Sequence, residues 1–237
     1  MDLLMKKYTL ILAFIVMLVT GNVHAATVKY KFTIDTKTVN FTGAPVVALA
    51  INKQIPGPTI TATVGDILEV TFDNKMDVET SIHWHGILLP NEQDGVPYLT
   101  TQPIAPHSSF TYNYKITHAG TYWYHSHTGL QEQRGIYGAL VFHPKNGARI
   151  KTDRDYVVVL SDWINASPKQ VLANLKQDGD YYALKKGSVQ SWDKVIKNGF
   201  GAIKKRLQGA WSRMGPMDLS DVRVMMHFLP MANSSRI

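Results

Sequence analysis

Short runs of alternating apolar and polar residues dominate the chain between residues 28 and 143, and this period of two constrains the fold most. The alternation is clear over residues 28–34, 67–72 and 110–116. Such runs are typical of strands with one buried face. Turn-forming residues separate them, at Pro56-Gly57-Pro58, Gly65-Asp66, Asp94-Gly95 and Ala119-Gly120. With no convincing helix in between, the pattern predicts an all-β Greek-key sandwich or barrel.

The pattern changes after Pro144, where Lys145-Asn146-Gly147 forms a polar linker. The apolar run at 156–160 predicts the first strand of a second domain. Ser167-Pro168 predicts the start of a helix, and residues 191–211 predict a longer helical stretch. We therefore expect a first domain over residues 26–146 and a second over residues 147–237.

The first 25 residues resemble a secretory signal peptide. Lys6 and Lys7 precede an apolar stretch over residues 8–19, and Val23-His24-Ala25 provides a cleavage site before Ala26. The alternative is a membrane anchor, but the stretch is shorter than the roughly 20 apolar residues that a bilayer span needs. We expect a secreted protein without a stable membrane anchor, located in the periplasm if the source is a Gram-negative bacterium.

Composition limits the chemistry of any site in this chain. Its 237 residues include no cysteine, which excludes disulfides, thiol nucleophiles, Cys-based zinc or iron–sulfur sites and thiolate-ligated copper. A metal must therefore use His, Asp, Glu or Met. The formal charge is +7, but Lys and Arg are scattered along the sequence, so we do not expect nucleic-acid binding.

Four of the nine histidines form two identical spacings, His83-Trp84-His85 and His125-Ser126-His127. Residues i and i+2 of a strand face the same side, about 6 to 7 Å apart. Two such pairs on adjacent strands would bring four imidazoles together, a donor set that suits copper, zinc, nickel or iron. Each pair could chelate one ion, or its two members could bind different ions of a cluster. A chance occurrence is the alternative, and it is less favoured for two pairs than for one.

Longer motifs around these pairs resemble the multicopper oxidase family. They are His83-Trp84-His85-Gly86, Asp94-Gly95-Val96-Pro97 and residues 120–127, read as GTYWYHSH. Residues 51–60, read as INKQIPGPTI, are similar to a loop of the family's first domain. Ser161-Asp162-Trp163 and residues 171–175 extend the likeness, which covers roughly residues 28–221 and is strongest to the copper-resistance protein A branch.

The resemblance implies a cupredoxin-like first domain followed by a partial second cupredoxin-like domain with a helical insertion. It also implies that His83 binds the type 2 copper and that His85, His125 and His127 bind the type 3 copper pair. Asp94 resembles the family's carboxylate that supplies protons during oxygen reduction. A simple Asp-Gly turn is an equally good interpretation of Asp94.

The chain departs from the family pattern in three respects. It has no cysteine for the type 1 copper, and it lacks the two further His motifs that complete the three-copper cluster. Residues 222–237 lack the alternation expected there, which suggests a truncated or frameshifted copy. We therefore expect no turnover by this chain alone, unless an oligomer or a complementing chain supplies the missing ligands.

The resemblance implies an oxidoreductase linked to copper resistance, which would couple the oxidation of Cu(I) or a phenol-type substrate to the reduction of O₂. The alternative is a non-catalytic periplasmic protein that binds or sequesters copper through the same four histidines. A mononuclear His-ligated zinc enzyme is less favoured, because no distinctive motif provides its third ligand and base. Oxygen consumption distinguishes the first two functions.

Overall fold

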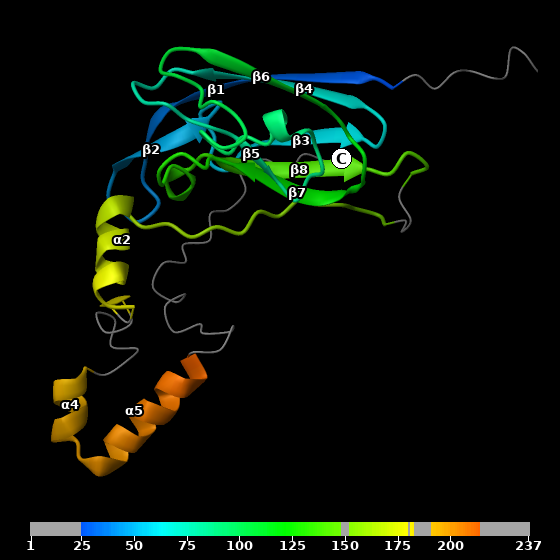
Figure 1. The fold of residues 1–237 in the computed structure, drawn as a ribbon. Helices are drawn as coiled ribbons and strands as arrows, with labels where there is room; N and C mark the ends of the chain where they lie inside the picture. Colours follow the sequence, from blue (N-terminus) through cyan, green and yellow to red (C-terminus); the bar gives the residue numbers. More distant parts are fainter. Residues whose placement is uncertain (1–24, 148–151, 180, 183–190, 214–237) are drawn as a thin grey trace, which may run out of the picture.

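Two four-stranded β-sheets face each other in the computed structural model, which describes residues 25–147, 152–179, 181–182 and 191–213 (Figure 1). The first sheet has the order β2-β1-β4-β6, with bounds β2 Val46–Ile51, β1 Thr27–Val39, β4 Ile67–Asn74 and β6 Ser109–Lys115. The second has the order β3-β8-β7-β5, with bounds β3 Gly57–Thr63, β8 Tyr137–His143, β7 Gly120–His125 and β5 His83–His85. β1 pairs with β4 and β3 with β8 in parallel, while the other neighbours are antiparallel.

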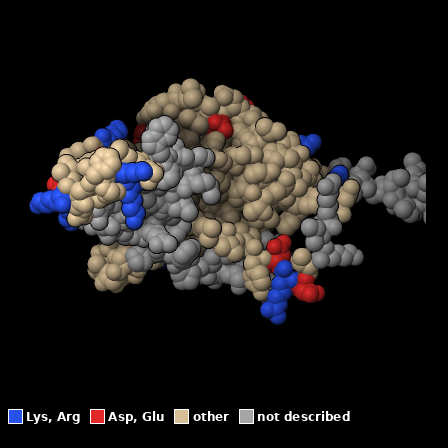
Figure 2. Space-filling view, turned by 90° about the horizontal axis from the view of Figure 1, so that it is seen from below, with Lys and Arg blue, Asp and Glu red and all other residues tan. Residues whose placement is uncertain are grey.

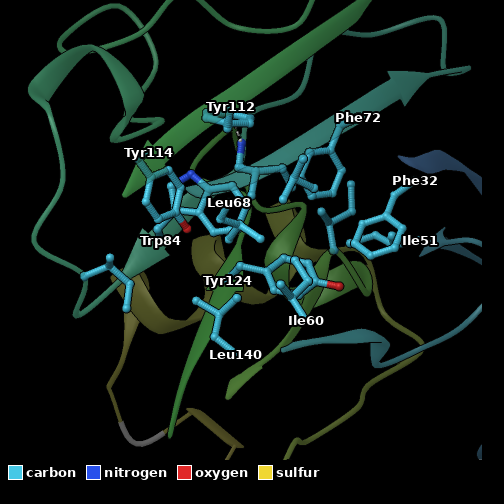
Figure 3. Packing of buried hydrophobic residues seen from close by; sticks show 14 of the residues in the cluster. Phe32, Ile51, Ile60, Leu68, Phe72, Trp84, Tyr112, Tyr114, Tyr124 and Leu140 are labelled. Carbon is cyan, nitrogen blue, oxygen red and sulfur yellow. Dashed lines mark hydrogen bonds between the residues drawn. The ribbon is translucent and has the colours of Figure 1, made fainter. Parts of the chain in front are cut away.

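The predicted alternation is confirmed in β1, β4 and β6. β4 shows it most regularly, because Leu68, Val70 and Phe72 are fully buried while the residues between them are only partly covered. These side chains enter the core between the two sheets, where they meet residues of β7 and β8 (Figure 3). The all-β sandwich expected from the sequence is therefore correct.

Trp84 lies at the centre of this core and decides where its two neighbours point. Its indole is fully buried among Tyr112, Tyr114 and Tyr124, with ring centroids 5.3, 5.2 and 6.2 Å away (Figure 3). Since successive side chains of a strand face opposite sides, burying Trp84 turns the residues before and after it away from the core. The histidines of β5 therefore lie on the outer face of the second sheet.

Tyr124 has the same effect in β7, where its burial sets the direction of its two neighbours. Its hydroxyl donates to the Pro58 carbonyl over 2.7 Å, and its ring passes close to Gly57 and Gly138 of the neighbouring strands. A Cβ added to Gly138 would lie 2.4 Å from the Tyr124 hydroxyl oxygen, so this crossing requires glycine. Burial of Tyr124 directs Trp123 and His125 to the opposite face, beside the histidines of β5.

Helices follow the sandwich, with bounds α2 Pro168–Gln177, α4 Trp192–Lys197 and α5 Phe200–Arg213. The helix predicted to start at Ser167-Pro168 is confirmed. The predicted helical stretch over 191–211 is interrupted at Asn198-Gly199, where Gly199 adopts a φ of +80°. The sequence pattern does not predict this break, because the helical spacing of the apolar residues continues across it.

The strand predicted over residues 156–160 is wrong. Its alternation is present, but a strand also needs a hydrogen-bonded neighbour, and no described segment pairs with these residues. Tyr156, Val158 and Leu160 are accordingly 52%, 67% and 74% exposed. Residues 1–24 of the expected signal peptide and the tail from residue 222 lie outside the described residues.

Charge is distributed unevenly over the face in Figure 2. Lys and Arg side chains gather at the end of the molecule where α4 and α5 lie, while the visible surface of the sandwich carries few of them. None of the helices within the described ranges has the length and apolar character needed to cross a membrane.

Candidate metal centre

The pairing of β5 with β7 brings the two His-X-His motifs together. The strands are antiparallel, with His83 opposite His125 and His85 opposite Trp123. His127 follows directly after β7, and its ring centroid lies 4.5 Å from that of His83 and 4.8 Å from that of His125. The structure therefore places all four histidines singled out from the sequence in one cluster.

The ring nitrogens of this cluster converge. One nitrogen each of His83, His85 and His125 lie within 4.8 Å of one another, and His85 Nδ1 is 3.2 Å from His125 Nε2. Two nitrogens that each stand about 2.0–2.1 Å from one metal ion are about 3.3 Å apart at a tetrahedral angle. His85 and His125 thus fit a shared ion, and this pair joins the two motifs rather than lying within one.

The loop containing Asp94 contacts the ring of His83. His83 Nδ1 lies 2.8 Å from the main-chain oxygen of Asp94 and 3.4 Å from its carboxylate oxygen Oδ1. A proton on Nδ1 satisfies this carbonyl and leaves Nε2 as the ligand atom. The carboxylate stays close enough to interact with the ring without being its main support.

Gly95 explains how this loop approaches the strand so closely. It adopts a φ of +78°, and an added Cβ would lie 1.7 Å from the carbonyl oxygen of Ile82. Its N–H donates to Thr101 Oγ1 over 2.9 Å. The Asp-Gly turn and the contact of Asp94 with His83 are therefore two properties of one loop.

His125 is the most enclosed member of the cluster, being 4% exposed. Trp123 stacks on its ring at a centroid distance of 3.9 Å and an interplanar angle of 9°. Glu132 Oε2 lies 2.8 Å from its Nδ1. The sequence had not singled out Glu132; the only available signal was an acidic residue in a turn shortly after the second His-X-His motif.

Hydroxyl and amide side chains fix the segment that carries His127. The backbone N–H of His127 donates to Ser81 Oγ over 3.1 Å. The Ser126 hydroxyl donates to Gln131 Oε1 over 3.0 Å, and the Thr80 hydroxyl donates to the same oxygen over 2.7 Å. These bonds tie the residues after β7 to those before β5, which holds the two motifs in register.

Burial and crowding favour the neutral form of two rings. Desolvation lowers the pKa of His85, and the neighbouring His125 and His83 lower it further. Desolvation also lowers the pKa of His127, with added repulsion from His83 and His125. Since the usual pKa is about 6.5, both rings are neutral at pH 7, as a metal ligand must be.

The cluster is accessible from outside, because His85 and His127 are exposed while His125 is buried. An all-imidazole donor set suits copper, zinc, nickel and iron, and no thiolate narrows this choice. The arrangement can hold a metal on one side and leave the other side open to further ligands.

Comparison with known proteins narrows the choice among copper, zinc, nickel and iron. The multicopper oxidase family model matches residues 33–147. Copper resistance protein A of Escherichia coli is 41% identical over 196 residues, covering 82% of this chain and 32% of the relative. Laccase-1 of Cryptococcus neoformans (strain B-3501A) is 35% identical over 175 residues, covering 70% of this chain and 27% of the relative.

Solved structures agree with these relatives. The blue copper oxidase from Nitrosomonas europaea matches with a TM-score of 0.56 and 33% identity, covering 60% of this chain and 48% of that one. The laccase from Botrytis aclada matches with a TM-score of 0.56 and 36% identity, covering 64% and 29%. The chain spans about a third of the length of the curated relatives it matches. On the strength of the domain match and the identity to these relatives, the chain belongs to the multicopper oxidase family.

Proposed function

We propose that this chain supplies four histidine ligands to the copper centre of an oxidoreductase that serves copper resistance. The observation that carries this proposal is the convergence of ring nitrogens from β5 and β7, above all the 3.2 Å between His85 Nδ1 and His125 Nε2. Identity to copper resistance protein A supports the choice of copper over zinc, nickel or iron.

In this proposal His83 binds the type 2 copper, and His85, His125 and His127 bind the type 3 pair. The shared position of His85 and His125 supports the second assignment, and the separate anchoring of His83 by the Asp94 carbonyl supports the first. Copper bound there would supply the electron transfer that couples oxidation of Cu(I) or a phenol-type substrate to reduction of O₂. The protein's own contribution is to hold neutral rings with fixed ligand atoms.

Asp94 has the proposed role of a proton donor. Reduction of O₂ to water consumes protons, and a carboxylate beside the site can deliver them. The Asp94 side chain is 27% exposed, so it can recover protons from solvent while it lies 3.4 Å from His83. This role is compatible with the turn that Asp94 forms with Gly95.

In this proposal the four imidazoles of this chain are only part of the ligand set of the copper centre. The 237 residues contain no cysteine, so this chain offers no thiolate for a type 1 copper. We assign residues 26–146 to the first cupredoxin-like domain and residues 147–237 to an incomplete second one, and we assign residues 1–25 to export into the periplasm. A thiolate-ligated copper for electron entry would come from another polypeptide, and the remaining histidine ligands would come from that polypeptide or from a second copy of this chain.

The second candidate is a non-catalytic copper-binding or copper-sequestering protein. The exposure of His85 and His127 favours it, because an open site can accept and release an ion without further partners. Both candidates predict copper binding at the same histidines. They differ in oxygen uptake, which only the oxidoreductase shows.

The test is copper loading of the purified exported chain under reducing conditions, followed by exposure to air. We expect two or more coppers per chain in the unmodified protein and a loss of tight binding in the double variant His85→Ala/His125→Ala. His107→Ala is the matched control, because His107 is exposed and paired with Asp77 outside the cluster. Unchanged binding in the double variant would contradict the site, and binding without oxygen uptake would favour the sequestering protein.

A further inference from the structure

Glu132 lies behind the buried ligand of the cluster. It belongs to the short 3-10 turn η2 (Glu132–Arg134), and its Oε2 is 2.8 Å from His125 Nδ1. The His125 side chain is 6% exposed and that of Glu132 is 33% exposed. A carboxylate at hydrogen-bonding distance from such an enclosed ring has a strong influence on which ring nitrogen carries the proton.

A second acceptor acts on the same nitrogen. The carbonyl oxygen of Ser126 lies 3.3 Å from His125 Nδ1. Two acceptors at Nδ1 require a proton there in the neutral ring, which leaves the lone pair on Nε2. His125 Nε2 is the atom that faces His85 Nδ1 at 3.2 Å. The proton on one side of the ring thus sets the ligand atom on the other.

Packing fixes the plane of the ring but not its proton. Trp123 stacks on His125 with an interplanar angle of 9°, which holds the ring orientation. Stacking alone permits both neutral tautomers, because it makes no bond to either nitrogen. Glu132 therefore selects the tautomer of His125, which Trp123 cannot do.

The turn that carries Glu132 is itself held in place. The side chain of the preceding Gln131 donates to the Glu79 carbonyl over 2.8 Å and accepts from Thr80. Gly135 ends the turn at a φ of +121°, and an added Cβ there would lie 2.2 Å from the Leu49 carbonyl oxygen. Glu132 is thus presented by a fixed segment rather than by a free loop.

We infer that Glu132 is a positioning residue, which keeps His125 protonated at Nδ1 so that Nε2 serves as the metal ligand. That His125 binds a metal rests on the proposed function. The tautomer of His125 does not, because it is a property of the metal-free chain. Carboxylates of this kind orient metal-bound histidines, and their loss costs roughly 10- to 100-fold in metal affinity.

The first test measures the tautomer in the metal-free protein. In ¹⁵N-histidine NMR spectra of the full chain, we expect His125 to carry its proton on Nδ1 in the unmodified protein and in Glu132→Gln, whose amide oxygen still accepts. In Glu132→Ala we expect a mixture of both tautomers or the Nε2-protonated form. Full retention of the Nδ1 proton in Glu132→Ala would overturn the inference.

The second test measures Cu(I) affinity by competition with a chromogenic chelator. Glu132→Ala should bind Cu(I) roughly 10- to 100-fold more weakly, and Glu132→Gln should remain close to the unmodified protein. Glu69→Ala is the control, because Glu69 lies on β4 of the other sheet, where it pairs with Lys29 of β1. Equal affinity in Glu132→Ala and the unmodified chain would contradict the positioning role.

The two tests separate the two claims. If the unmodified chain binds no copper but the tautomer shifts in Glu132→Ala, the proposed function fails and the positioning role of Glu132 stands. If copper binds and the tautomer stays unchanged in Glu132→Ala, the proposed function stands and the positioning role of Glu132 fails. Circular dichroism of each variant checks that the fold is retained, and Glu132→Leu, which also removes the acceptor but keeps more of the side-chain volume, replaces Glu132→Ala if that variant does not fold.

Discussion

Two groups of Asp94 lie beside the His83 ring, the carbonyl that holds its orientation and the carboxylate to which we assign proton supply. The main-chain oxygen of Asp94 lies 2.8 Å from His83 Nδ1, nearer than the carboxylate at 3.4 Å. A main-chain carbonyl is unaffected by side-chain substitution. The ring orientation and the proton-donating role of Asp94 can therefore be tested independently.

Asp94→Asn should leave copper affinity and stoichiometry unchanged, because the carbonyl still fixes His83. Where the unmodified protein consumes oxygen, the variant should consume it at least about 10²-fold more slowly, because the amide cannot donate a proton as the acid does. Copper competition and an oxygen electrode measure the two quantities. A marked loss of copper affinity would show that the carboxylate, and not the carbonyl, holds His83.

The four histidines could be predicted from the sequence, because the spacing i, i+2 places side chains on one face of any strand. The sequence could not decide how they share ions, since this depends on the register that puts His83 opposite His125. Glu132 escaped detection for a related reason. Its contact with His125 depends on a turn whose path is set by hydrogen bonds to residues before β5, far away in sequence.

β5 has only three residues, so its position depends on contacts at its ends. The backbone N–H of Ile82, just before the strand, donates to the Tyr112 hydroxyl of β6 in the opposite sheet over 3.2 Å. The carbonyl of the same residue faces Gly95. These two contacts connect the first His-X-His motif to the core.

Tyr112→Phe should lower the free energy of unfolding by about 1–3 kcal/mol, because it leaves the buried N–H of Ile82 without its acceptor. Tyr114→Phe is the matched comparison. Its hydroxyl is also buried but has no hydrogen-bond partner among the described residues, so its removal should be neutral or stabilising. Urea unfolding measures both, and equal destabilisation by the two variants would contradict this difference.

Gly95→Ala should destabilise the protein more than Gly65→Ala. Both glycines have positive φ angles, +78° and +103°, so both substitutions introduce backbone strain of about 1–3 kcal/mol. Only at Gly95 does the added Cβ also collide with a carbonyl, that of Ile82. Thermal and urea unfolding compare the variants, and similar losses would show that the loop can move away from β5.

Alternation along the chain was sufficient to predict β1, β4 and β6, because each buries one face in the same core. The same signal failed at residues 156–160, because it reports which side chains could be buried and not whether a partner strand exists. The helix break at Asn198-Gly199 was missed since the apolar spacing carries no information on Gly199's positive φ.

The sandwich as a whole should lose stability at alkaline pH. Burial raises the pKa values of Tyr112, Tyr114 and Tyr124 above the ordinary value near 10. The unfolded chain ionises these groups near pH 10 while the folded chain keeps them protonated, so their contribution is complete below pH 10 and declines above it. Absorbance at 295 nm should show these residues ionising together with unfolding; early ionisation without unfolding would contradict their burial.

Copper-edge anomalous diffraction from crystals of the copper-loaded chain tests the proposed copper site most directly. We expect a copper peak within bonding distance of both His85 Nδ1 and His125 Nε2, the two atoms that lie 3.2 Å apart across β5 and β7. Further peaks should lie beside His83 and His127. Copper bound only at other histidines, or no peak at the cluster, would contradict the assignment of this face as a copper site.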